Sequence, residues 1–119
     1  MELTLYTETF FDAAHFLRNY EGKCASLHGH TWKLCIWVKG EESQLDERDI
    51  LWDFTNAKLM ASRYDHKNLN EVMEGNPTAE RLVIETLGTL KKDRPELRFK
   101  VRVYESLASK SSYCEGGDF

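Results

Sequence analysis

The pattern that most constrains the fold is the strict alternation of side chains over residues 31–39. A period of two is the period at which the side chains of a β-strand change faces. One face carries Trp32, Leu34, Ile36 and Val38, and the other carries Lys33, Cys35, Trp37 and Lys39. Residues 3–11 and 99–104 also alternate and are rich in residues typical of strands, so both are predicted to be strands. The last residues are expected to add a further strand.

Two helices are predicted between the second and third strands. The first covers residues 54–64, and its inward-facing positions are predicted to be Phe54, Leu59, Met60 and Tyr64. The second begins at Thr78, a suitable N-cap, and ends before Pro95. The predicted order is therefore ββααββ, an α+β fold with an antiparallel four-stranded sheet, in one domain over residues 1–119.

Charge and hydropathy narrow the classes of partner. The net charge is −4, with 16 Lys and Arg scattered among 20 Asp and Glu. Because there is no basic stripe to neutralise phosphates, nucleic acid is not expected as the main partner. No apolar run approaches the roughly 20 residues that span a bilayer, and the first residues lack the layout of a signal peptide. We therefore expect no membrane association and a cytoplasmic location, in which the cysteines are thiols.

The histidines carry the clearest chemical signal. Three of the four, His15, His28 and His30, lie within sixteen residues. The spacing of two in His28-Gly29-His30 points both rings the same way on extended backbone, and a hairpin would bring His15 to them. Three neutral imidazoles with an open fourth position are the ligand set of a catalytic zinc ion, so a metal site is predicted. The alternative is three unrelated polar histidines in loops.

The role of Cys24, four residues before His28, is open among three alternatives. A nearby zinc ion would favour its thiolate form and make it a usable base. A Cys24 thiolate bound to the ion would instead close the site into a structural one. Cys24 as a small buried apolar side chain would carry no chemistry.

Asp65, His66 and Glu105 complete the set of candidates. A carboxylate beside an imidazole can fix its tautomer and raise its basicity, although a solvated aspartate and a helix-end histidine explain Asp65-His66 equally well. Glu105 ends the third predicted strand, where a carboxylate can accept two hydrogen bonds from the edge of a guanidine-like ring. An exposed strand-end glutamate is the simpler interpretation of that position alone.

In combination, these residues resemble the family of 6-pyruvoyl- and 6-carboxy-tetrahydropterin synthases. The matching segments, in the order of the family, are Phe11-Asp12-Ala13-Ala14-His15, Gly22-Lys23-Cys24-Ala25-Ser26-Leu27-His28-Gly29-His30, Asp53-Phe54, Asp65-His66-Lys67-Asn68-Leu69-Asn70, Asn76-Pro77-Thr78-Ala79-Glu80 and Glu105-Ser106. Each segment is a weak signal alone, and the ordered set is a strong one. Ser106 departs mildly, because the family often has Thr there.

The resemblance implies roles for the metal ligands and the base. His15, His28 and His30 would bind Zn²⁺, and Cys24 would abstract a proton from the substrate. The spacing from Cys24 to His28 is similar to that of the 6-carboxy-tetrahydropterin synthases of the queuosine and deazapurine pathway. The implied reaction converts 7,8-dihydroneopterin triphosphate to 6-carboxy-5,6,7,8-tetrahydropterin, acetaldehyde and triphosphate.

The resemblance also implies a second acid–base unit and an assembly. Asp65 with His66 would form that unit, and Glu105 would anchor the pterin ring. The implied architecture is the tunnelling fold (T-fold), in which subunits assemble a barrel, commonly as homo-hexamers with active sites between chains. The alternatives are a 6-pyruvoyl-tetrahydropterin synthase, a related pterin side-chain lyase, or a non-catalytic module that binds zinc and pterin.

Overall fold

The fold is built on a long antiparallel hairpin of β1 (Glu2–His15) and β2 (His28–Glu41). In the computed structural model, which describes residues 1–108 and 110–119, Glu2 pairs with Glu41 at one end and His15 pairs with His28 at the other. Both strands extend beyond the alternating segments that predicted them. As a result, the hairpin carries all three clustered histidines on regular backbone.

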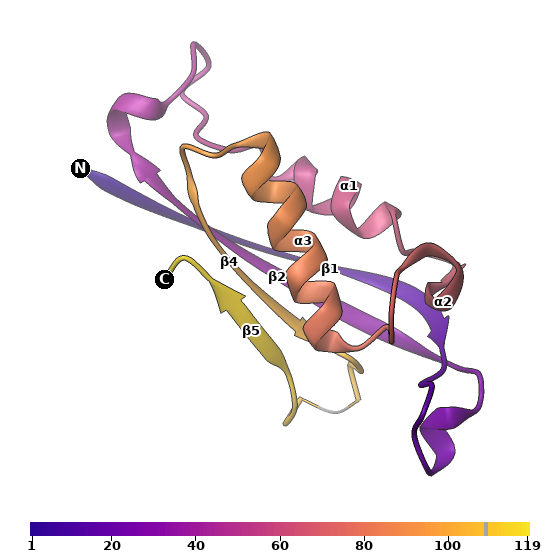
Figure 1. Ribbon diagram of the computed structural model, residues 1–119. Coiled ribbons are helices and arrows are strands. Elements are labelled where there is room, and N and C mark those ends of the chain that lie inside the picture. The colour runs from indigo at the N-terminus through magenta and orange to yellow at the C-terminus, as the bar shows by residue number, and fades with distance from the viewer. Residues whose placement is uncertain (109) are drawn as a thin grey trace.

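The sheet has five strands in the order β3-β1-β2-β4-β5 (Figure 1). β4 (Arg98–Tyr104) is antiparallel to β2, and β5 (Cys114–Gly117) is antiparallel to β4, which confirms the predicted antiparallel strands. β3 (Lys67–Asn68) is a fifth strand, parallel to Ala13 and Ala14 of β1. The sequence did not predict it, because two residues are too few to show a period. The sheet of one chain is open, with β3 and β5 at its edges.

The two predicted helices are α1 (Thr55–Ser62) and α3 (Ala79–Asp93). The side chain of Thr78 accepts a hydrogen bond from the backbone N–H of Arg81, so it caps α3 as expected. Three short elements were not predicted: α2 (Leu69–Val72) and the 3₁₀ turns η1 (Lys23–Ala25) and η2 (Glu42–Gln44). The element order therefore remains ββααββ, with short additions.

The core lies between the sheet and the helices, which cover one face of it (Figure 1). The predicted inward face of β2 is buried throughout, at Trp32, Leu34, Ile36 and Val38. Met60 and Tyr64 are buried as predicted, but Phe54 and Leu59 are exposed. That part of the prediction is wrong, since α1 begins after Phe54 and packs through Ala57, Met60 and Ala61.

Within the described residues, no helix has the length and apolar character needed to cross a membrane.

Candidate functional site: a three-histidine cluster

The three histidines converge at one end of the hairpin. His15 is paired with His28, and His30 is paired with Ala13, so the register places all three side chains on the helix-covered face. Their ring centroids lie 4.6 to 5.2 Å apart. One ring nitrogen from each lies within 4.8 Å of the other two. The predicted juxtaposition is present, and the role of these residues as ligands remains a prediction.

Backbone carbonyls fix which nitrogen faces the centre of the cluster. His15 Nδ1 is 2.7 Å from the carbonyl oxygen of Pro77, and His28 Nδ1 is 2.6 Å from that of Ser26. Because a carbonyl only accepts, both Nδ1 atoms must donate, which leaves each Nε2 with its lone pair free. Such outer contacts orient the histidine ligands of metal ions in proteins.

The free nitrogens have an unfavourable arrangement unless something binds them. His15 Nε2 and His28 Nε2 are 3.1 Å apart, so two lone pairs would face each other in the tautomers just described. His30 Nε2 is buried without a hydrogen-bond partner among the described residues. A metal ion accepts lone pairs from all three nitrogens at once, so the donor set fits a divalent ion that prefers imidazole, such as zinc.

An apolar wall formed by Trp32 borders this cluster. Trp32 is fully buried and meets the rings of His15 and His30 edge-on, with centroids 5.0 and 5.6 Å away. Burial lowers the pKa of His30, the nearby Glu105 carboxylate opposes this, and His15 and His28 add to the lowering. The unprotonated imidazole, which is the form that binds metals, is therefore favoured.

Glu105 lies between the three-histidine cluster and a neighbouring cavity. Its carboxylate lies 3.5 Å from His30 Nε2 and 3.8 Å from His15 Nε2, just after the end of β4. The same residue lines a cavity of about 620 Å³ between the start of α3 and β5, whose wall includes Thr78, Glu80, Tyr113 and Cys114. A flat ring held there by Glu105 would lie beside the three imidazoles.

Asp65 and His66 form a second cluster with Asp12. Asp65 Oδ2 is 2.9 Å from His66 Nδ1, and Asp65 Oδ1 accepts the backbone N–H of Asp12 at 2.9 Å. The backbone N–H of His66 donates to the carbonyl of Asp12, which holds His66 at a positive φ of 59°. The Asp12 N–H, and then His66, lower the pKa of Asp65. Asp65 thus orients an imidazole that is 80% exposed.

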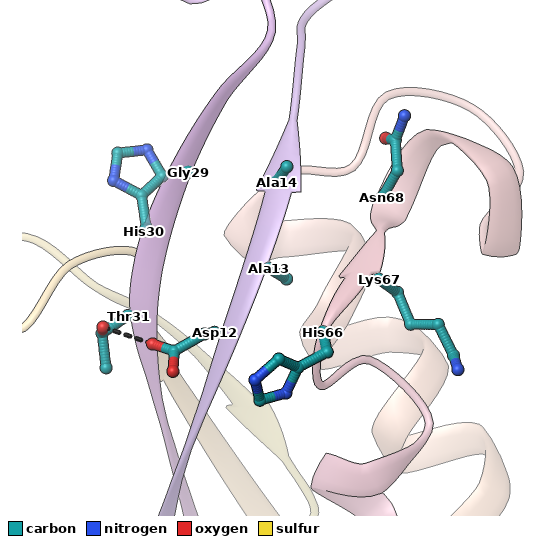
Figure 2. A pocket seen from close by; sticks show the side chains of 9 residues that line it. All are labelled: Asp12, Ala13, Ala14, Gly29, His30, Thr31, His66, Lys67 and Asn68. Carbon is teal, nitrogen blue, oxygen red and sulfur yellow. Dashed lines mark hydrogen bonds between the residues drawn. The ribbon is translucent and has the colours of Figure 1, made fainter.

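The two clusters lie on different sides of the hairpin. Asp12 pairs with Thr31, one position along from the pair of Ala13 and His30, so their side chains project from the face that the helices leave bare. Figure 2 shows the Thr31–Asp12 hydrogen bond and the His66 ring turned toward Asp12, with the His30 ring pointing away. Within one chain, the structure does not bring Asp65 and His66 to the three-histidine cluster.

Cys24 lies in η1, within the loop that joins β1 to β2. It is half-buried, and its sulfur is not among the atoms that group within 4.8 Å at the cluster, as far as the described residues show. In this conformation, Cys24 is therefore not placed as a fourth ligand beside the three histidines.

Sequence reasoning missed several residues that build the site. Asn76-Pro77-Thr78 was predicted to start a helix and to resemble a segment of the family, without a role at the histidines, whereas the Pro77 carbonyl orients His15. A backbone carbonyl leaves no trace in residue identity, so no sequence signal could have found it. Asp12, beside Asp65, lies within a segment that had been matched to the family, and its polar side chain in a strand was the available signal.

The fold and the site together define an α+β protein with a candidate metal centre of three imidazoles at the end of a β-hairpin. The sequence model of one family, 6-pyruvoyl tetrahydropterin synthase, matches residues 4–115. The chain belongs to this family. A solved structure, that of Caenorhabditis elegans 6-pyruvoyl tetrahydropterin synthase, covers the whole chain with a TM-score of 0.76 at 23% identity and 97% coverage of its own chain. That likeness confirms the tunnelling fold.

Curated relatives differ in their names and in the extent of the match. The chain is 29% identical over 117 residues to the 6-carboxy-5,6,7,8-tetrahydropterin synthase of Synechocystis, covering 92% of this chain and 91% of the relative. It is 31% identical over 99 residues to the dihydroneopterin monophosphate aldolase of Pyrococcus furiosus, covering 80% and 81%. A protein of Pyrococcus horikoshii is 38% identical over 64 residues, which are 53% of this chain and only 39% of that protein.

Proposed function

We propose that the protein is a zinc-dependent 6-carboxy-tetrahydropterin synthase. It would convert 7,8-dihydroneopterin triphosphate and water to 6-carboxy-5,6,7,8-tetrahydropterin, acetaldehyde and triphosphate, as a carbon–carbon lyase of queuosine and deazapurine biosynthesis. The observation that carries the proposal is the convergence of three Nε2 atoms beside Glu105 and an adjoining cavity. The name of the Synechocystis relative supports the choice of product.

His15, His28 and His30 would hold the ion through their Nε2 atoms. Bound zinc supplies Lewis acidity, which polarises substrate oxygens and makes the adjacent C–H more acidic. Pro77 and Ser26 keep the two Nδ1 protons in place, so the ligand nitrogens remain available.

Glu105 would bind the pterin ring. Its carboxylate faces the cavity beside the cluster and can accept two N–H groups from the ring edge. A substrate analogue without those N–H groups would leave the carboxylate unpaired, which gives selectivity for pterins. Substrate held in this way would present its side chain to the imidazoles.

Cys24 would remove a proton from that side chain, and His66, oriented by Asp65, would donate or accept another. The exposed His66 ring has its Nδ1 occupied by Asp65, so Nε2 is the atom that would carry the proton. Cys24 would have to approach the substrate from the loop between β1 and β2.

The position of Asp65 and His66 supports a homo-oligomer, proposed here as a hexamer with active sites between chains. These residues lie on the bare side of the hairpin, away from the imidazoles of their own chain. In the described residues, β3 pairs only with Ala13 and Ala14, so most of the outer edge of β1 is free to accept a strand from another subunit. A neighbouring chain could then supply the second acid–base unit. Each subunit would be a single domain, located in the cytoplasm.

A side-chain aldolase is the second candidate, because the P. furiosus relative carries that name and matches most of this chain. It would use the same metal centre and pterin pocket and would release a different fragment. A 6-pyruvoyl product and a non-catalytic zinc- and pterin-binding module are the remaining alternatives.

Product analysis separates these candidates. Zinc-loaded protein would be incubated with 7,8-dihydroneopterin triphosphate and the products identified by mass spectrometry. We expect 6-carboxy-tetrahydropterin and acetaldehyde, their loss in Cys24→Ala, and normal turnover in the matched control Cys35→Ala. A hydroxymethyl or pyruvoyl pterin would reassign the reaction. No conversion by zinc-loaded protein would favour the non-catalytic module, and zinc loss in Cys24→Ala would make Cys24 a ligand.

A further inference from the structure

Two asparagine side chains hold the chain where it leaves β1. Asn70 Oδ1 accepts the backbone N–H of Phe16 at 2.9 Å, and Asn70 Nδ2 donates to the carbonyl of Phe16 at 3.0 Å. Asn76 makes the same pair of bonds with Arg18, at 2.7 and 2.9 Å. Each amide therefore satisfies both backbone groups of one residue.

The two asparagines bind the chain just beyond the last residue of β1, where Phe16 is no longer part of the strand and Arg18 lies in a turn. There the backbone groups have no neighbouring strand to pair with, and the two side-chain amides take that place. β3 pairs with β1 two residues earlier, at Ala14. Only a carboxamide can both donate and accept in the manner of a peptide group, and Asn is the shorter of the two residues that carry one.

The residues held in this way anchor the loop that carries Cys24. The backbone N–H of Leu17, between the two clamped residues, donates to the carbonyl of Cys24 at 2.8 Å. The guanidinium of Arg18 donates to the carbonyl of Gly75 at 3.0 Å, which ties the loop again to the segment before Asn76. Asn70 and Asn76 thus bind the residues on either side of Leu17, and Leu17 in turn binds Cys24.

The same segment also sets the metal centre. Pro77, the residue after Asn76, supplies the carbonyl that orients His15. The segment Asn76-Pro77 therefore orients His15 through the Pro77 carbonyl and holds the Cys24 loop through the Asn76 side chain. This common support gives Cys24 a defined position relative to the imidazoles.

We propose that Asn70 and Asn76 are positioning residues that hold the Cys24 loop in place beside the metal centre. The proposal deepens the proposed function, because it takes Cys24 as the base. Neither asparagine contacts the substrate in this scheme. Their effect is on the step that needs Cys24 and on the mobility of residues 16–27.

The decisive variants are Asn70→Asp, Asn76→Asp and the double variant. Aspartate has the same shape and keeps the acceptor, but its carboxylate cannot donate and would face a carbonyl oxygen. Asn56→Asp, in α1 away from the loop, is the matched control. Three quantities would be measured on zinc-loaded protein: hydrogen–deuterium exchange of residues 16–27, zinc affinity, and kcat with KM for the pterin triphosphate.

We expect exchange in residues 16–27 to speed up about tenfold in each single variant, which corresponds to the net worth of a hydrogen bond. Zinc affinity should change less than threefold, and kcat should fall at least tenfold with a smaller change in KM. The control should match the wild type. Unchanged exchange, or faster exchange with an unchanged kcat, would overturn the proposal.

If the wild-type protein showed no turnover, the proposed function would be rejected. The positioning role of Asn70 and Asn76 would still be tested by a second measurement. In that case the readout is the rate of alkylation of Cys24 by iodoacetamide, followed by peptide mass spectrometry. A rate altered at least threefold in the asparagine variants, but not in Asn56→Asp, supports the positioning role. Equal rates in the wild type, the three asparagine variants and the control overturn it.

Discussion

Zinc should raise the melting temperature of the protein by binding to the three-histidine cluster of the folded chain. His15 and the His28–His30 pair are brought together by the hairpin, so the complete ligand set exists only in the folded chain. Zinc at about a hundredfold excess over its Kd then adds about 2.7 kcal/mol. At about 2.1 cal/mol/K per residue, the unfolding entropy of 119 residues is about 0.25 kcal/mol/K. The expected rise in Tm is therefore about 11 °C.

Two variants test whether the ion occupies this cluster or the one around Asp12. His28→Ala removes one of the three proposed Nε2 ligands. Changes outside the ligand shell already weaken metal sites by about 10–100-fold, so we expect at least a hundredfold loss here. At the same zinc concentration the stabilisation would then be about 0.4 kcal/mol, or about 2 °C. His66→Ala alters only the second cluster and should keep the full shift.

The assay is differential scanning calorimetry of metal-stripped and zinc-loaded protein at one protein concentration. The reasoning is refuted if His28→Ala keeps a shift near 11 °C, or if His66→Ala abolishes it. Either outcome would place the ion outside the three-histidine cluster.

Three further predictions concern single residues. Glu105→Gln should raise the KM for the pterin roughly 10–100-fold, as expected for loss of charge-assisted hydrogen bonds, while keeping the zinc-induced Tm shift; unchanged pterin binding would remove its anchoring role. The lowered pKa of Asp65 means that its contribution to stability is complete above the unfolded value of about 3.9 and is lost as the pH falls through the folded value. Carboxyl NMR should therefore find its midpoint below about 3.9, and a midpoint at or above that value would contradict the hydrogen bond from Asp12. Gly117→Ala should lower the free energy of unfolding by about 1–3 kcal/mol, because Gly117 has a φ of 152° and a Cβ there would collide with the Phe99 carbonyl oxygen; urea unfolding with a change below about 0.5 kcal/mol would be inconsistent with that contact.

The strands were predictable because burial leaves a period in the sequence. Trp32, Leu34, Ile36 and Val38 alternate with more polar positions, and all four are buried in the structure. The start of α3 was also predictable, since Thr78 caps the helix as the sequence indicated. Leu59 was misplaced because an eight-residue helix leaves little periodicity from which to choose a face.

The site was predictable only in part. The spacing of His28 and His30 implied a shared face, and the hairpin register that adds His15 to it follows from the alternation. The separation of Asp65 and His66 from that face depends on β3, a two-residue strand without a sequence pattern. The clamp by Asn70 is a tertiary contact across 54 residues, which no local pattern encodes.

The hairpin register also has a consequence for folding. Side chains alternate with a period of two, so a slip of β2 by one residue against β1 would turn His28 and His30 toward the bare face and leave His15 behind. Such a misfolded hairpin could not gather three imidazoles around one ion. Zinc present during folding would therefore stabilise only the hairpin with the correct register. The metal site would in this way select the correct strand alignment.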